Sequence, residues 1–282
     1  MKASVGACKR LPLLPATESG LSTLRDLETR FQRDRQRPAD VLAGWSSDDP
    51  ALTRVARAIG QALDDHAGRV PEPAYHNRHH FAEAVVAMGT LCRIACAENL
   101  LSQRLADLGL LAMVGHDLGH DGSLALPGVL ESRAAEAVLA LAEALGPADR
   151  EILAHVIRHT DATTVPSNLA RARAPGATAL DHLTALANEA DVLASLLPGL
   201  GLELSELLAA EWQPHDAARA AAACSFGGRV QFLTVYASPT GPGRTLGLEG
   251  CIAGQLRAIT PDMDLLPRAE AVSKYRKQAL LF

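Results

Sequence analysis

The sequence lacks a long hydrophobic run and a large net charge. Its longest uninterrupted apolar stretch, residues 108–115, is far too short to span a bilayer. The 27 Lys and Arg residues and 32 Asp and Glu residues give a formal charge of −5, which offers no support for broad nucleic-acid binding. No persuasive signal peptide opens the chain. We therefore expect a cytoplasmic protein that binds neither nucleic acid nor a membrane.

Cysteines are few and irregularly spaced. The five of them are odd in number and scattered, and Cys92 and Cys96 are four residues apart on a predicted helix. Residues at this spacing lie above one another on one helix face, unlike the two-residue-spaced cysteines of a zinc clip. We interpret the cysteines as small buried side chains in a reducing compartment.

Strand-like alternation of polar and apolar residues is also missing, whereas Ala and Leu recur at helical spacing. We predict an all-α fold, a compact helical bundle with residues 1–20 as a flexible N-terminal arm and residues 21–282 as a single domain. A polar connector is expected at 37–49, and loops at 172–178 and 238–243. Helices are predicted over 22–31, from Pro50 to about 59, and over 79–99, 102–118, 131–145, 148–160, 179–197, 205–211, 217–236 (with a break considered at 227–228), 246–259 and 267–281.

Six of the ten histidines form pairs four residues apart. The pairs are His76/His80, His116/His120 and His155/His159. Residues at this spacing share a helix face, so each pair can project two imidazoles toward one point. One such pair is ordinarily a polar surface or a hydrogen-bonded core feature, but three pairs in a chain with 4% aromatic residues favour a functional site.

The dipeptide His116-Asp117 follows an apolar helical segment that has no evident polar face near its end. Burying an imidazole and a carboxylate there costs several kcal/mol unless they are paired or bind a cation. Neutral imidazole and carboxylate are both ligands of divalent metals, and a carboxylate can bridge two ions. The dipeptide therefore indicates a metal site.

Four candidate ligands occur in the order His, His-Asp, Asp on separate predicted helices: His80, His116, Asp117 and Asp191. This order resembles the metal-binding HD superfamily of phosphohydrolases. Residues 75–80, Tyr-His-Asn-Arg-His-His, are similar to the Tyr-His-Asn-x-x-His signature of the class I cyclic-nucleotide phosphodiesterase catalytic domain. Residues 116–122 resemble its His-Asp-x-x-His-x-Gly motif, and residues 129–131, 160–161 and 190–191 resemble shorter motifs. The resemblance covers about residues 71–197, the expected metal-site core.

The resemblance implies a metal-dependent phosphodiesterase that acts on a phosphate ester, with 3′,5′-cyclic nucleotides as the first substrates to test. His80, His116, Asp117 and Asp191 would hold one ion, zinc by this likeness, and Asp117 would bridge to a second, magnesium or manganese. The waters of the second ion would be held by His120, Glu131 and Thr160. A hydroxide between the ions would attack phosphorus, and His76 would be the general acid, although a histidine in a surface loop is the alternative interpretation.

The same likeness assigns substrate contacts to six residues: Tyr75, Asn77, Asp161, Arg229, Gln231 and Phe232. The sequence departs from the family at three places. Arg229 stands three residues before Phe232, where the family has a purine-binding glutamine, and an arginine only donates hydrogen bonds. Ala194 replaces a polar pocket residue. His159 replaces a small residue, which suggests either a direct ligand of the second ion or an ordinary helix-face histidine.

Three other functions stay open at this point. Arg229 and Ala194 motivate a nucleotidase or phosphomonoesterase of the same superfamily. A di-iron oxygenase of the HD type would often have a histidine at the position of Leu130, and His155 and His159 compensate only in part. A non-catalytic binding module would be expected to have lost some of these residues. Apolar helices at 246–259 and 269–282 suit a core role and the pairing of a homodimer equally.

Overall fold

The computed structural model describes residues 20–33 and 36–279, and in these residues the chain is built from α-helices with no strand. The predicted all-α fold is therefore confirmed. The predicted N-terminal arm lies outside the described residues except for Gly20, where the first helix begins. The helices are α1 (Gly20–Arg33), α2 (Pro38–Ala43), α3 (Pro50–Ala67), α4 (Arg78–Ala97), α5 (Gln103–Gly115), α6 (Val129–Leu141), α7 (Pro147–Arg158), α8 (Val165–Arg173), α9 (Ala179–Leu196), α10 (Gly201–Trp212), α11 (Ala217–Cys224), α12 (Phe226–Val235), α13 (Gly241–Leu246), α14 (Leu248–Ala258), the 3₁₀ turn η1 (Met263–Leu265) and α15 (Arg268–Ala279).

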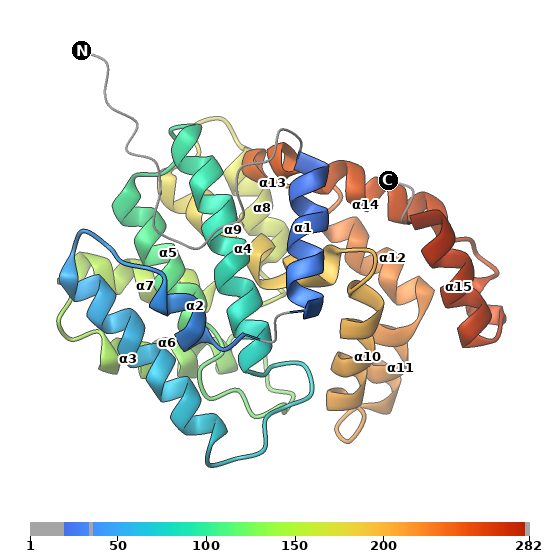
Figure 1. The fold of residues 1–282 in the computed structure, drawn as a ribbon, viewed down its shortest axis with the longest axis horizontal. Helices are drawn as coiled ribbons and strands as arrows, with labels where there is room; N and C mark the ends of the chain where they lie inside the picture. Colours follow the sequence, from blue (N-terminus) through green and yellow to red (C-terminus); the bar gives the residue numbers. More distant parts are fainter. Residues whose placement is uncertain (1–19, 34–35, 280–282) are drawn as a thin grey trace.

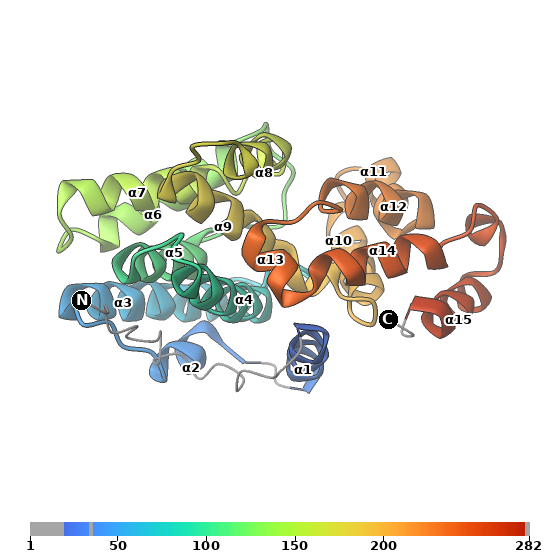
Figure 2. The same ribbon diagram turned by 90° about the horizontal axis from the view of Figure 1, so that it is seen from above.

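The helices form an elongated bundle with two ends (Figures 1 and 2). Helices α3 to α7 gather at one end, and α10, α11, α12, α14 and α15 gather at the other, with α9 and α13 between them. Helix α4 packs against its neighbour in sequence, α5, and against the distant α9, so the three helices are in mutual contact. This α4–α5–α9 unit carries the residues on which the functional argument depends.

Helix α4 is a core helix. Within the part of the chain that the structure describes, it is the single straight helix long and apolar enough to cross a membrane, but 78% of its apolar window is buried inside the protein. The pair α9 and α10 passes the same test together and is bent by 101°. Leu91, Val85 and Met88 of α4 are fully buried in the main hydrophobic cluster.

Polar caps set the starts of the helices around the site. The Asn77 side chain accepts hydrogen bonds from the amides of His79 and His80 and so begins α4. Thr178 and Asp181 form a capping box at the start of α9. These caps supply partners for amides that the helices cannot pair internally, and the Asn77 cap fixes the first turn of α4, which carries His80.

Several predicted boundaries differ from the structure because tertiary contacts decide them. The expected connector at 37–49 contains α2, whose Val41 and Leu42 are buried. The expected loop at 238–243 gives way to α13, because Thr240 caps this helix and is itself held by the buried Glu189. Helix α8 was not predicted at all.

Two predicted long helices are broken. The helix expected over 217–236 is interrupted at Ser225 rather than at the two glycines, because the Ser225 hydroxyl accepts from the Gly228 amide and starts α12. The helix expected over 246–259 is divided at Gly247, which has φ +95°. Glycine adopts this left-handed conformation without steric cost, so it ends α13 and starts α14.

Candidate metal centre

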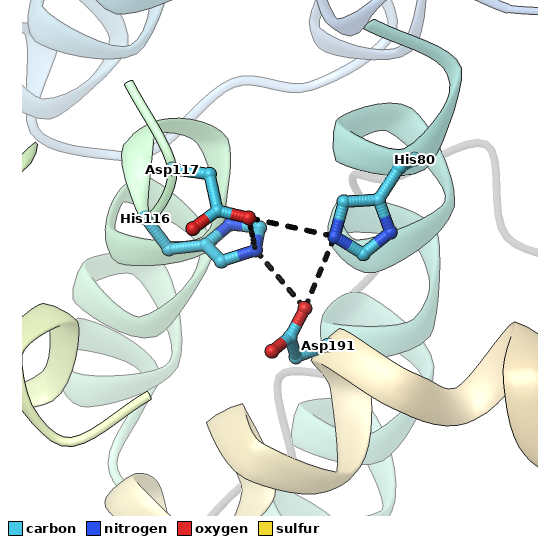
Figure 3. Close-up of side chains that lie close together, drawn as sticks. All are labelled: His80, His116, Asp117 and Asp191. Carbon is cyan, nitrogen blue, oxygen red and sulfur yellow. Dashed lines mark hydrogen bonds and ion pairs between the residues drawn. The ribbon is translucent and has the colours of Figure 1, made fainter. Parts of the chain in front are cut away.

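Four side chains from three parts of the chain converge in the middle of the bundle (Figure 3). His80 comes from the first turn of α4, His116 and Asp117 follow the end of α5, and Asp191 lies on α9. One ligand atom from each lies within 4.8 Å of every other. The structure thus brings together all four residues that the sequence predicted as ligands.

The distances within this cluster are short. Asp191 Oδ1 lies 3.1 Å from both His80 Nε2 and His116 Nε2. Asp117 Oδ2 lies 3.3 Å from His116 Nε2 and 3.7 Å from His80 Nε2. Both carboxylates therefore face both imidazoles across a space the size of one ion.

A hydrogen bond to the backbone fixes the orientation of the His116 ring. Its Nδ1 atom donates to the backbone oxygen of Met113 at 2.9 Å, since a carbonyl oxygen can only accept. The neutral ring then carries no hydrogen on Nε2, and this bare nitrogen faces the carboxylates. This is the arrangement by which a backbone carbonyl sets the tautomer of a metal-ligating histidine.

The cluster buries imidazoles and carboxylates together, and their pKa values shift strongly because of this. Burial alone would lower the pKa of His80, but Asp117 and Asp191 outweigh it and raise that pKa to about 9. Burial would likewise raise the pKa of Asp117 and of Asp191, yet the neighbouring imidazoles hold both pKa values below the ordinary range. Charges of opposite sign are thus buried together and need one another or an ion.

The donor set fits a divalent metal. His80 Nε2 is buried and makes no hydrogen bond of acceptable geometry, although Asp191 Oδ1 is only 3.1 Å away. Two imidazole nitrogens and two carboxylate oxygens are the ligand types of zinc and of related transition metals. An ion between them would give the unpaired nitrogen a partner and would neutralise the two carboxylates.

A second group lies beside the first and includes a residue that the sequence did not predict. Glu211, at the end of α10, accepts from His76 Nδ1 at 2.5 Å and from the backbone amides of Tyr75 and His76. The ring of His120 stacks on that of His76, with centroids 4.0 Å apart. Burial would raise the pKa of Glu211, but its bonds with His76 lower it, so the carboxylate is ionised. His76 Nε2 points the other way and lies 4.0 Å from Asp117 Oδ2.

The three residues that the sequence predicted around a second ion, His120, Glu131 and Thr160, have different hydrogen-bond partners and surroundings. Glu131, at the start of α6, is half-buried, and burial together with the charges of Asp161, Asp117 and Asp191 raises its pKa. The Thr160 hydroxyl donates to the Ile157 carbonyl. His120 belongs to the group with His76, and the Gly122 amide donates to its Nδ1.

His159 lies apart from both groups. Its ring stacks on that of His155, with centroids 4.0 Å apart, and its Nδ1 donates to the His155 carbonyl. Both histidines line a separate depression on α7. Within the described residues, neither of them belongs to a cluster that could hold a metal.

A cavity of about 370 Å³ adjoins the metal centre, and its wall includes His76 and Asp191. Of the predicted substrate-binding residues, Tyr75, Arg229 and Phe232 line it. Arg229 is buried and bonds to the protein itself, donating to the Ser195 carbonyl and to Gln255 Oε1.

The other three predicted contacts are not among the residues that line this cavity. Asn77 serves as the cap of α4 and donates to the Ala74 carbonyl. The Asp161 carboxylate accepts from the backbone and hydroxyl of Thr163. Gln231 is exposed on α12.

Comparison with known proteins agrees with this architecture. No protein-family model matches the sequence, and no curated protein is similar to it. Two solved structures of the phosphodiesterase domain of a rhodopsin–phosphodiesterase fusion protein from the choanoflagellate Salpingoeca rosetta are similar in fold. One has a TM-score of 0.53 at 13% identity and covers 99% of this chain and 97% of that domain. The other has a TM-score of 0.57 at 14% identity and covers 95% of this chain and 100% of that domain. The chain thus has the all-helical fold of these phosphodiesterase domains.

Proposed function

We propose that this protein is a metal-dependent phosphodiesterase of the HD type, with cyclic nucleotides as the first substrates to test. The observation that carries the proposal is the convergence of His80, His116, Asp117 and Asp191 beside His76. A fold shared with phosphodiesterase domains supports it. The catalytic domain is assigned to residues 21–282, and its partner is a small phosphoester.

The four clustered residues would hold the first ion, with zinc the best match to the donor set. Asp117 has its second carboxylate oxygen available for another ion, which magnesium or manganese would suit, and Glu131 and His120 are the nearby groups that could hold its waters. Bound divalent ions supply a hydroxide near neutral pH and withdraw charge from phosphate oxygens. The proton transfer and the positioning of the substrate would depend on side chains of the protein itself.

His76 is the proposed general acid. Since the Glu211 carboxylate accepts only, Nδ1 of His76 carries a proton, and Nε2 is directed toward the metal centre. A protonated ring can therefore release the Nε2 proton to the departing ester oxygen, which is a poor leaving group until it is protonated. Glu211 keeps the ring in this orientation and stabilises its positive charge.

His120 has a defined part in this arrangement. Burial, and then the adjacent His76, lower the pKa of His120. It therefore stays neutral when His76 is charged, and a neutral ring stacked at 4.0 Å packs against the general acid without repelling it.

The remaining aspects of the proposal concern location and partners. We propose that the enzyme is cytoplasmic and binds neither nucleic acid nor a membrane. We also propose that it forms a homodimer through its C-terminal helices. The second candidate function, a nucleotidase or phosphomonoesterase, rests on the Arg229 and Ala194 departures. The Arg229 guanidinium bonds to the Ser195 carbonyl and to Gln255, and Ala194 is buried in the main hydrophobic cluster, so no observation favours this alternative. An iron oxygenase gains no support either, since His155 and His159 line a different depression.

A substrate panel with a histidine variant tests the proposal. The metal-reconstituted protein is assayed with cAMP, cGMP, bis(4-nitrophenyl) phosphate and AMP, and metal content is measured alongside. We expect turnover of diesters rather than of AMP, and we expect His76→Ala to lower kcat at unchanged metal content. His182→Ala, outside both groups, is the control. Loss of metal in His76→Ala would make His76 a ligand, and inactivity of the metal-loaded wild type toward every diester would refute the proposal.

A further inference from the structure

The cavity beside the metal centre offers a substrate few polar partners. Its walls are largely apolar and include Val165, Val192, Leu204, Leu208 and Phe232. At about 370 Å³ it is large enough for the non-reacting part of a small phosphodiester. Recognition in such a cavity depends on shape and on whichever polar groups remain free.

Three of the four buried polar residues that line the cavity are already bonded within the protein. The Tyr75 hydroxyl and the Ser195 hydroxyl lie 3.0 Å apart and bond to each other. Arg229 directs its two terminal nitrogens to carbonyls at the end of α9 and to Gln255 of α14. Turning any of these groups to a ligand would break a buried hydrogen bond, which is costly.

The fourth is Tyr236, which follows the end of α12. It is 4% exposed, it lines the cavity, and its hydroxyl makes no hydrogen bond to any described residue. Its ring packs on that of Phe232, with centroids 5.5 Å apart. Burial, followed by the charge of Asp191, raises the pKa of this phenol, so the hydroxyl keeps its proton and can donate it in a hydrogen bond.

One other polar side chain that lines the cavity, Arg219, is exposed to water. Arg219 has no ion pair among the described residues, but it is exposed, and its guanidinium lies 4.2 Å from the centre of the Trp212 ring. Water satisfies an exposed guanidinium, whereas the Tyr236 side chain is almost entirely buried in the cavity wall and its hydroxyl has no hydrogen bond to a described residue. Tyr236 is therefore the group inside the cavity that a ligand would satisfy.

We propose that Tyr236 is a specificity-determining residue that donates one hydrogen bond to an oxygen of the substrate's sugar or phosphate portion, while the apolar walls hold the base by shape alone. The proposal rests on the proposed phosphodiesterase function. Tyr236 and Asp191 line the same cavity, so a ligand that reaches the candidate metal centre there also passes Tyr236. No buried group remains to read the edge of a purine, so the site accepts different bases alike.

Steady-state kinetics of Tyr236→Phe with cAMP and cGMP tests this. These substrates share the ribose and phosphate and differ in the purine edge. We expect wild-type kcat/KM values for the two within about threefold, and we expect Tyr236→Phe to raise KM for both by about 5- to 15-fold with kcat within twofold. Tyr275→Phe is the matched control, because its buried hydroxyl bonds to Gln255 away from the cavity, and its KM should not change.

Several results would overturn the inference without touching the proposed function. These are a KM change with one nucleotide only, no KM change with either, a loss of kcat alone, or a wild-type preference for one base above about thirtyfold. An equal KM rise in Tyr275→Phe would show a general loss of structure and would also overturn it. Inactivity of the wild type toward both nucleotides and toward bis(4-nitrophenyl) phosphate would instead refute the phosphodiesterase function itself.

Discussion

At the scale of single residues, the site combines side chains of two kinds. His80, His116, Asp117 and Asp191 face one another, and their ligand atoms lie within 4.8 Å. His76 and Glu211 approach the same point from the side and are joined by a 2.5 Å hydrogen bond. The first group has the chemistry to hold a cation, and the second has the chemistry to move a proton.

The role of Glu211 can be separated from metal binding by one substitution. In Glu211→Gln the amide cannot stabilise the charged His76 ring, so we expect kcat to fall about 10- to 100-fold with metal content unchanged. Steady-state assays with metal analysis of the same sample measure both quantities. Glu206→Gln, on the same helix but exposed, is the control and should keep wild-type kcat. A full-activity Glu211→Gln enzyme would contradict the assignment.

The four candidate metal ligands could be predicted from the sequence, whereas Glu211 could not. A His-Asp dipeptide after an apolar helix has few physical explanations besides a cation, and the motif at 75–80 adds His80. Glu211 is separated from His76 by 135 residues and follows no recognisable spacing, so only the packing of α10 against the loop before α4 brings it there. Arg229 was predicted to contact the substrate, but it donates a hydrogen bond to Gln255 instead, and nothing in the sequence indicates that these two residues meet.

At the scale of elements, the site depends on how closely α4, α5 and α9 approach. Gly109 of α5 lies where the other two helices meet, and a Cβ atom added there would lie 2.5 Å from Met88 of α4 and 2.7 Å from Leu183 of α9. Both close atoms are side-chain ends, Met88 Cε and Leu183 Cδ1, so the missing side chain of Gly109 leaves room for the two neighbouring helices to pack their side chains against α5. Short elements such as α2, α8 and α13 were missed or misplaced in the sequence because contacts with other helices, rather than local propensity, form them.

Gly109→Ala should therefore destabilise the protein by about 1–3 kcal/mol through overpacking. Urea unfolding followed by circular dichroism measures this. Gly250→Ala is the matched control, because that glycine is also helical but has open space around its Cβ position. We expect it to be neutral or to stabilise by about 0.5–1 kcal/mol. Equal effects of the two substitutions would refute the close approach of the helices.

Arg229 joins three elements, and its loss should affect stability before it affects catalysis. It donates from α12 to carbonyls at the end of α9 and to Gln255 of α14. Arg229→Met removes the donor to the Ser195 carbonyl, and it leaves Gln255 Oε1 with Tyr275 and the Leu197 carbonyl with the Gly201 amide as remaining donors. We therefore expect a loss of about 2–4 kcal/mol in the free energy of unfolding. Arg219→Met removes an exposed guanidinium and should cost under about 0.5 kcal/mol. A stable Arg229→Met protein with a selectively raised KM would instead make Arg229 a substrate contact.

At the scale of the whole molecule, the candidate metal centre joins segments from distant parts of the chain. Its candidate ligands come from α4, from the residues after α5, and from α9, the helix between the two ends of the bundle in Figure 2. An ion bound there would hold the folded arrangement and would find no preformed site in the unfolded chain. If this protein binds the proposed ion, metal binding and global stability are therefore coupled.

Thermal unfolding should reveal this coupling. With free zinc at 1,000 times its Kd, linkage predicts about 4 kcal/mol of stabilisation, which corresponds to a rise in Tm of roughly 10 °C. Calorimetry of chelator-treated and reloaded protein measures the shift. Asp191→Asn replaces a ligand at nearly constant volume, so its Tm should hardly respond to added zinc. A Tm that is insensitive to metal in the wild type would contradict a structural link between the three segments.

The most direct test of the central claim is hydrolysis of bis(4-nitrophenyl) phosphate and cAMP by the chelator-treated protein before and after zinc and manganese are restored. The account predicts no turnover in the metal-free protein, recovery on reloading, and no recovery in Asp191→Asn under the same conditions. Equal hydrolysis with and without metal, or recovery in Asp191→Asn to the wild-type rate, would contradict it.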